Sequence, residues 1–348
     1  MKRLVIYNLE TNLDSNVLAA AHDWVESFAK NVDQVIVYST HVGRINLPTH
    51  VIVREIGGGS PARKALAVLR LLKSVAIEFP NRNRLTVFHH MSTRSLLIVG
   101  LFYKLMGVRQ GLWYSHSKKA FTLSASQILA NRIFTSTPSA IPILNERVKF
   151  IGHGLKSERF LGNNLGALQK RDGIVAIGRV VPVKKIELLV EAVSKSKIAN
   201  LGITCIGPHE AGGVYPNKIL ELARVEGMDL SLRNAIAYKE IPNALRGFDF
   251  IFTGTPKSVD KAVIEGAMSG CFVISSEEQA IKLTGMDQVF KSLGFESTPA
   301  IENQLIAISG LPSEEKEYLR SILSSKAAEL NDLDQTTQKI LIELESKL

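Results

Sequence analysis

A glycine and two cations follow one strand-like stretch in the middle of the chain. The stretch 173–177 is short and mostly apolar. Gly178 and Arg179 follow it directly, and Lys184 comes five positions after Arg179. Glycine lets a backbone approach a ligand closely, and the first amides of a following helix favour anions. Arginine adds a planar fork of donors and lysine a point charge. The spacing therefore predicts a diphosphate site, with a solvated basic turn as the alternative.

A second candidate region is the polar stretch 253–270 between two apolar runs. It places Glu265 in a short predicted helix among apolar neighbours, where a carboxylate needs a polar partner. In dinucleotide-binding folds an acid beside the ligand accepts hydrogen bonds from ribose hydroxyls, so Glu265 is a candidate for that role, or else a helix-surface charge. Backbone amides at the helix start are candidates for a phosphate: Ser258, Val259, Asp260 and Lys261.

The elements that must position these residues have the pattern of an α/β protein. Short β-branched runs alternate with amphipathic stretches along the chain, which is typical of parallel sheets wound with helices. The predicted strands are 3–8, 34–39, 51–56, 85–89, 111–115, 132–136 and 148–151, then 173–177, 202–206, 230–235, 250–253 and 272–275. Two series of similar size predict two doubly wound domains, whose ligands bind beyond the carboxyl ends of the strands.

The domain boundaries follow from composition. The Gly/Asn-rich stretch 161–166 lacks any periodicity and is the expected linker. We place an N-terminal domain at 1–163 and a second domain at 170–324. The last 36 residues carry no strand signal and predict one or two helices, and we expect a helix at about 325–348 to pack back on the first domain.

The positive charge is concentrated in one half of the chain. Residues 1–170 hold 22 Lys and Arg against 9 Asp and Glu, whereas the remainder holds 20 against 24. A basic half indicates an anionic partner such as a nucleic acid, a phosphate-rich small molecule or an acidic lipid surface, unless the whole proteome is mildly basic. The two cysteines, Cys205 and Cys271, lie in apolar runs without metal-ligand spacing and are predicted core residues.

Membrane and secretion signals are weak. The longest apolar run, 96–103, is far shorter than the roughly 20 residues of a membrane-spanning helix. The N-terminal residues lack the apolar stretch of a secretory signal, so we expect a cytoplasmic protein.

Five short stretches, taken in order, resemble the family 4 retaining glycosyltransferases of the GT-B fold. They are 112–116, 150–155, Gly178-Arg179 with Lys184, 237–242 and 257–270. The resemblance covers roughly residues 110–275. It implies two Rossmann-like domains that face a central cleft, with the acceptor bound by the domain at 1–163 and the donor by the domain at 170–324. It further implies a nucleotide-diphosphate sugar as donor substrate and transfer with retained anomeric configuration. It also implies no catalytic metal and no cofactor.

The resemblance assigns roles residue by residue. Arg179 and Lys184 match the pair that holds the donor's diphosphate, Glu265 matches the acid on the ribose, and His116 matches a histidine facing the donor sugar. The leaving phosphate itself would take the acceptor's proton, so electrostatic support of that group would be the main catalytic effect. The donor-binding candidates are Gly178, Lys257, Ser258, Val259, Asp260, Lys261 and Glu265. Three further candidates for the cleft are Asn12, His153 and Gly154.

The sequence also departs from the family pattern. Lys257 stands eight positions before Glu265, where the family has a carboxylate, and the glycine pair after the first strand is absent. One hypothesis from Lys257 and Lys261 is an anionic donor sugar such as a uronic acid. The alternative is that both lysines face solvent or phosphate. Asp332 and Asp334 have the spacing of a metal-binding motif, but no strand precedes them, so we predict no metal site there.

The leading hypothesis is a glycosyltransferase on the inner face of the cell membrane that extends a lipid-linked or glycan acceptor during surface polysaccharide biosynthesis. The basic first half motivates the contact with an anionic membrane surface. The alternative is a non-catalytic nucleotide-sugar-binding subunit that supports a partner glycosyltransferase. A nucleic acid partner is disfavoured because no helix-turn-helix, RNP or zinc pattern accompanies the basic residues.

Overall fold

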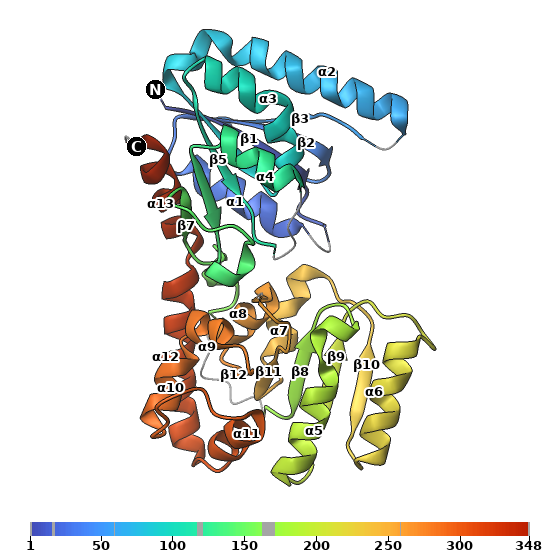
Figure 1. Cartoon of the computed structure of the whole chain (residues 1–348). Helices are drawn as coiled ribbons and strands as arrows, with labels where there is room; N and C mark the ends of the chain where they lie inside the picture. Colours follow the sequence, from blue (N-terminus) through green and yellow to red (C-terminus); the bar gives the residue numbers. More distant parts are fainter. Residues whose placement is uncertain are drawn as a thin grey trace. The chain divides into compact units, whose positions relative to one another are not determined.

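A computed structural model describes residues 2–15, 18–58, 60–116, 121–161, 171–257 and 259–346. The chain forms two compact units, Met1–Gly154 with Leu333–Leu348, and Leu155–Asp332. Figure 1 shows the course of the chain and the labels used below. The chain leaves the first unit between Gly154 and Leu155, and residues 162–166 of the expected linker lie outside the described residues.

Seven parallel strands form the sheet in the described residues of the first unit. They are β1 (Arg3–Thr11), β2 (Gln34–Val42), β3 (Val51–Glu55), β4 (Leu85–His90), β5 (Arg109–Trp113), β6 (Arg132–Thr135) and β7 (Val148–Phe150). Their order is β3-β2-β1-β4-β5-β6-β7. Arg3 of β1 pairs with Gln34 of β2 on one side and with Leu85 of β4 on the other, so the strand order reverses at β1.

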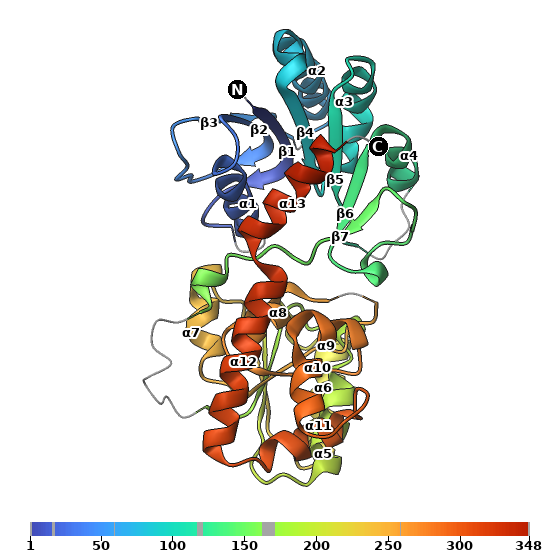
Figure 2. The same cartoon turned by 90° about the vertical axis from the view of Figure 1, so that its left-hand side faces the viewer.

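Helices cover both faces of this sheet, because β1 alternates its buried side chains between them. Leu4 and Ile6 pack in the cluster of α1 (Ala19–Ala29) and α13 (Leu333–Glu345). Val5 and Tyr7 pack in the cluster of α2 (Pro61–Glu78) and α3 (Thr93–Leu105). Figure 2 shows α1 and α13 on the same side of β1. The sheet is therefore buried on both faces, as parallel sheets require.

Local sequence explains where α2 begins. The Ser60 hydroxyl accepts a hydrogen bond from the Arg63 amide at 3.4 Å, and Pro61 occupies the first helical position. Both residues favour a helix start, since serine satisfies an orphan amide and proline has none to satisfy. The remaining elements of this unit are η1 (Phe79–Arg84), α4 (Phe121–Leu129) and η2 (Pro138–Ala140).

The described residues of the second unit form a five-stranded parallel sheet. Its strands are β8 (Ile174–Ile177), β9 (Ile203–Ile206), β10 (Leu230–Arg233), β11 (Phe250–Phe252) and β12 (Phe272–Ile274), in the order β10-β9-β8-β11-β12. Strand order reverses between β8 and β11, which is where ligands of doubly wound sheets bind. The shorter elements are η3 (Ser157–Arg159), η4 (Pro182–Lys184), η5 (Tyr238–Glu240) and α7 (Ile241–Leu245).

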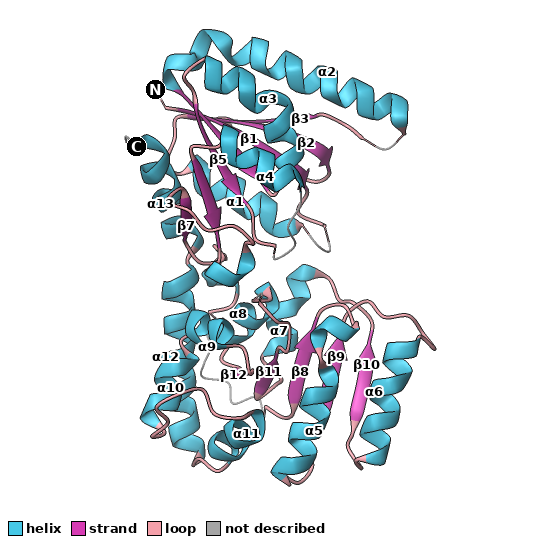
Figure 3. Ribbon diagram, in the orientation of Figure 1, coloured by secondary structure: helices cyan, strands magenta, loops and turns pink. Residues whose placement is uncertain are grey.

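The helices of the second unit enclose this sheet (Figure 3). They are α5 (Ile186–Ser196), α6 (Val214–Val225), α8 (Lys261–Met268), α9 (Glu278–Thr284), α10 (Met286–Ser292), α11 (Ile301–Ser309) and α12 (Ser313–Asn331). The α/β class predicted from the sequence is confirmed. Helices α10 and α11 were not predicted, because Gly285 ends α9 in a left-handed turn and splits the segment into pieces too short to show a period. Across the described residues, no helix is both long and apolar enough to cross a membrane.

Candidate functional site

Two glycines allow neighbouring strand ends of the second unit to approach closely. Gly178 follows β8 with φ of +134°, and Gly207 follows β9 with φ of +155°. A Cβ on Gly207 would lie 2.1 Å from the carbonyl oxygen of Gly178, so no side chain fits there. Gly178 was a predicted site residue. Gly207 was not, although a glycine directly after two successive strands is a signal that the sequence contains.

Lys184 lies over Gly178 and is bound by an acid of the same unit. Its ammonium Nζ is 2.6 Å from Oδ1 of Asp260, the residue before α8. The other carboxylate oxygen of Asp260 accepts hydrogen bonds from Thr253 at 3.1 Å and Thr255 at 2.8 Å. The predicted phosphate-binding lysine therefore already has an anionic partner. Asp260, predicted only for its backbone amide, contributes its side chain.

Arg179 lies beside this ion pair and remains available. It is exposed and, among the described residues, its guanidinium has no hydrogen bond or ion pair. Arg179, Gly178, Lys184 and Asp260 line one crevice with a free volume of about 10 Å³, roughly the space of one water molecule. The crevice is therefore too small to enclose a diphosphate, and Arg179 is its lining cation without an acidic partner among the described residues.

The start of α5 is less open to an anion than the sequence suggested. Lys185 precedes α5 in a left-handed conformation, with φ of +48°. The first helical amide, from Ile186, donates to the Tyr215 hydroxyl at 2.9 Å, and that hydroxyl donates to Glu187 at 2.6 Å. Burial raises the pKa of Tyr215 above its ordinary value, so the hydroxyl stays protonated. Tyr215 thus caps an amide that would otherwise face a ligand.

Glu265 has the polar partners that its position demands. Its carboxyl group is buried, and Oε1 accepts from the Tyr238 hydroxyl at 3.0 Å and pairs with the Lys261 ammonium at 3.3 Å. The same ammonium lies 4.1 Å from the centre of the Tyr238 ring, and the Arg159 guanidinium lies 5.5 Å from the same ring centre. Tyr238 lies in the matched stretch 237–242, but its contact with Glu265 joins η5 to α8, which are 27 residues apart in sequence.

Lys257 differs from Lys261 in its surroundings. Its side chain is exposed, its φ is +59°, and its amide donates to Glu277 at 3.3 Å. Among the described residues its ammonium has no acidic partner, whereas the charge of Lys261 is balanced by Glu265. The side chain of Val259 is buried in the core, which leaves its backbone as the part able to meet a ligand. Ser258 lies outside the described residues.

The candidates of the first unit have different environments. His116 is exposed just beyond β5, with its ring 6.4 Å from that of Tyr114. Asn12 closes its own loop, because its side-chain oxygen accepts from the amides of Asp14 and Arg44 at 3.0 and 3.1 Å.

Gly154 has a packing role. A Cβ on it would lie 2.8 Å from the Trp24 ring, whose indole N–H donates to the Gly154 carbonyl at 3.1 Å. His153 is half-buried between Gly152 and Gly154, which both have positive φ. Gly154, a candidate for the cleft, thus packs against the core around Trp24.

Solved structures similar to the whole chain are glycosyltransferases. HepE from Anabaena, in complex with UDP and glucose, matches over 100% of both chains with a TM-score of 0.69 and 13% identity. A glycosyltransferase from Rickettsia africae matches over 99% of this chain and 98% of its own, with a TM-score of 0.71 and 14% identity. WaaG, involved in lipopolysaccharide biosynthesis, matches over 99% and 100% with a TM-score of 0.54 and 13% identity.

The fold is GT-B. The fold predicted from the five sequence stretches is therefore confirmed, whereas identities of 13 and 14% define neither substrate nor mechanism. No protein-family model matches the sequence, and no curated protein does.

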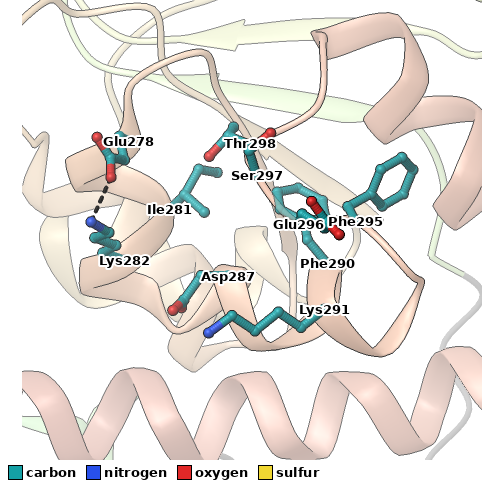
Figure 4. Close-up of a pocket in the computed structure, with 10 residues that line it drawn as sticks. All are labelled: Glu278, Ile281, Lys282, Asp287, Phe290, Lys291, Phe295, Glu296, Ser297 and Thr298. Carbon is teal, nitrogen blue, oxygen red and sulfur yellow. Dashed lines mark ion pairs between the residues drawn. The ribbon is translucent and has the colours of Figure 1, made fainter.

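A larger cavity of the GT-B chain lies away from these residues. It occupies about 550 Å³ between α9, α10 and the segment that follows them. Figure 4 shows its apolar residues, Ile281, Phe290 and Phe295, and the ion pair between Glu278 and Lys282 at 2.5 Å. None of the predicted site residues lines it.

Potential metal ligands also gather outside the donor site. In the described residues, one group of this kind is present on α1, where ligand atoms of His22, Asp23 and Glu26 lie within 4.8 Å of one another. His22 also accepts a hydrogen bond from the Asn46 amide at 3.1 Å. Asp334, of the DxD-like spacing, pairs with Lys30 of α1 at 2.6 Å, and both side chains are exposed.

Proposed function

We propose that this protein is a glycosyltransferase that moves a sugar from a nucleotide-diphosphate donor to a lipid-linked or glycan acceptor. The observation that carries the proposal is the unpaired guanidinium of Arg179, beside Gly178 and Lys184, at the point where strand order reverses in the second GT-B unit. A cation pair at this edge fits a diphosphate. The complexes of HepE with UDP and with UDP-glucose support a donor of this class.

Each side chain has a defined part in the proposed reaction. Arg179 holds the diphosphate through two parallel hydrogen bonds, and Lys184 leaves Asp260 to bind the same group. Glu265, fixed by Tyr238 and Lys261, accepts hydrogen bonds from the ribose. When the bond from the anomeric carbon to the phosphate oxygen breaks, both cations stabilise the charge on the leaving diphosphate.

We further propose that transfer retains the anomeric configuration and needs no catalytic metal. The leaving phosphate takes the proton of the acceptor hydroxyl on the face from which it departs, so no nucleophilic side chain takes part. His116, exposed just beyond β5, is the first-unit residue proposed to face the donor sugar. The lipopolysaccharide role of WaaG and the basic first half of the chain support an acceptor used in surface polysaccharide biosynthesis.

Calorimetric titration of the purified protein with UDP, GDP, dTDP and CMP tests the donor site. We expect one nucleoside diphosphate to bind, and the double variant Arg179→Ala/Lys184→Ala to lose at least about tenfold in affinity, since each charge-assisted contact contributes about 1.5–3 kcal/mol. Lys218→Ala removes an exposed lysine from α6 and serves as the matched control. Unchanged affinity in the double variant would overturn the proposal.

A second candidate function is a non-catalytic nucleotide-sugar-binding subunit of a partner glycosyltransferase. Two observations favour it: Lys257 replaces an acid of the resembled family, and Asp260 neutralises Lys184. Both candidates predict nucleotide binding. The two candidate functions are distinguished by supplying the protein with a donor and a lipid-linked acceptor. An enzyme then releases nucleoside diphosphate above background, whereas a non-catalytic subunit does not.

A further inference from the structure

An apolar hollow lies on the first unit, between α2, η1 and α3. Its volume is about 890 Å³. Leu72, Phe79, Phe102 and Leu105 line it with side chains that are 36%, 51%, 46% and 77% exposed, and Arg82 is the charged residue of its lining. Helices α2 and α3 pack side by side here (Figure 1). Apolar side chains gathered in this way on a soluble unit mark a binding surface. We call it the α2–α3 face.

The two sides of α2 explain how this surface arises. Leu71, Ser74, Val75 and Glu78 recur at helical spacing and are the buried residues of the helix. The opposite side carries Leu69, which is 62% exposed, and one turn later Lys73, which is also exposed. On a helix whose outward side faces only water, that side carries polar residues. Apolar and cationic residues therefore alternate on the outward side of α2.

The charge of this face has one sign. Within α2, η1 and α3 the sequence has eight Lys and Arg but a single acid, Glu78. That acid is fully buried and pairs with Arg3 at 2.7 Å. Over the described part of α2, η1 and α3, no basic side chain has an acidic partner. The occupant of the face must therefore supply negative charge as well as apolar contact.

We propose that the α2–α3 face docks on a bilayer surface that contains anionic phospholipid. Lipid phosphates match the unpaired cations, and the acyl region accepts the exposed leucines and phenylalanines in any arrangement. Arg82 stacks on Phe79, with its guanidinium 4.6 Å from the ring centre. That pair places a cation at phosphate level while its ring enters the apolar layer.

Other occupants fit the face less well. A second copy of the chain would bring like charge against like charge in a symmetric contact. A nucleic acid would match the cations but would leave the exposed leucines without an apolar partner.

Vesicle flotation with the whole chain tests the docking, using phosphatidylcholine vesicles with and without about one third phosphatidylglycerol at physiological salt. We expect binding to the anionic vesicles alone. Leu105→Ser and Lys73→Glu should each weaken that binding about tenfold, since each removes one apolar or one electrostatic contact. The matched controls lie on α13, against the other face of the sheet: Ile342→Ser removes an exposed apolar side chain and Lys339→Glu reverses an exposed cation.

Three outcomes would overturn the docking surface. The first is equal binding to neutral and anionic vesicles, and the second is equal losses in the α13 controls. The third is that the protein does not bind vesicles. In that case, self-association in analytical ultracentrifugation that Leu105→Ser disrupts would assign the face to a second copy of the chain. Nucleotide titration of the same samples keeps the result separate from the proposed transferase activity, because the residues proposed to bind the nucleotide, Arg179, Lys184 and Glu265, lie in the second unit.

Discussion

The Lys184 ammonium and the Asp260 carboxylate form an ion pair of 2.6 Å across two loops that are 76 residues apart. Their side chains are 18% and 23% exposed, so the pair is partly shielded from water. A phosphate that binds Lys184 competes with this carboxylate for the same charge. We therefore expect Asp260 to lower the affinity of Lys184 for an anion.

Asp260→Asn should strengthen nucleoside diphosphate binding. The amide oxygen can still accept from Thr253 and Thr255, but it no longer neutralises Lys184. We expect the dissociation constant to fall about fivefold, which corresponds to about 1 kcal/mol. Calorimetry with the nucleotide that the wild type prefers measures the change. Glu221→Gln on α6 removes the same charge from a distant surface pair and should have no effect. Weaker binding by Asp260→Asn would show that Asp260 positions Lys184 instead of competing for it.

Lys257 should decide between neutral and acidic donor sugars. It is an exposed lysine without an acidic partner among the described residues, so an anionic group on the sugar would be its natural ligand. Lys257→Glu is expected to lower transfer from a uronic acid donor about tenfold relative to the neutral hexose donor, since it replaces attraction by repulsion. Competition between the two donors gives that ratio directly. A ratio that does not change, with both sugars transferred, would assign Lys257 to solvent or phosphate.

Acid should destabilise the first unit through a buried histidine. His89 is fully buried, and burial lowers its pKa to about 3, while burial of His90 lowers that pKa to about 4. In the unfolded chain both have pKa values near 6.5, so the unfolded state binds more protons as pH falls from about 6.5 towards 4. Each histidine then removes up to about 1.4 kcal/mol of unfolding free energy per pH unit.

His89→Gln should abolish one of these two contributions and flatten the pH dependence between pH 4 and 6. Urea unfolding followed by tryptophan fluorescence reports on this unit alone, because both tryptophans, Trp24 and Trp113, belong to its core. The glutamine variant is expected to be less stable at pH 7 but to lose less on acidification. Equal pH slopes for variant and wild type would rule out His89 as the titrating group.

The strands could be predicted from sequence almost completely, because buried parallel strands are continuous apolar runs. The boundary of β5 was missed by two residues, since Arg109 and Gln110 begin it. Tertiary contacts satisfy both: Arg109 donates to the Leu344 carbonyl at 3.0 Å and Gln110 to that of Gly100 at 2.8 Å. Such contacts are invisible in a local pattern.

The candidate site could likewise be predicted from the sequence only in part. The positions of Gly178, Arg179 and Lys184 after β8 follow from the order of elements alone. The partners of Lys184 and Glu265 do not, because Asp260 and Tyr238 reach them from other loops. Local spacing thus located the cations but could not show which of them were already neutralised.

Ile340→Ala on α13 should destabilise the first unit by about 2–5 kcal/mol, because its fully buried side chain packs in the cluster of Trp24 and Phe134. Ile342→Ala is the control, since its side chain is 59% exposed and should cost less than about 0.5 kcal/mol. Urea unfolding with tryptophan fluorescence measures both. Similar losses in the two variants would mean that α13 contributes little to this core.

The return of α13 has a consequence for how the protein is made. Residues up to Gly154 leave the ribosome long before Leu333–Glu345, which complete their hydrophobic cluster. Until then the aromatic residues Trp24, Phe88 and Phe134 are not covered by α13. The N-terminal half of the nascent chain therefore cannot complete this cluster before nearly the whole polypeptide has been translated.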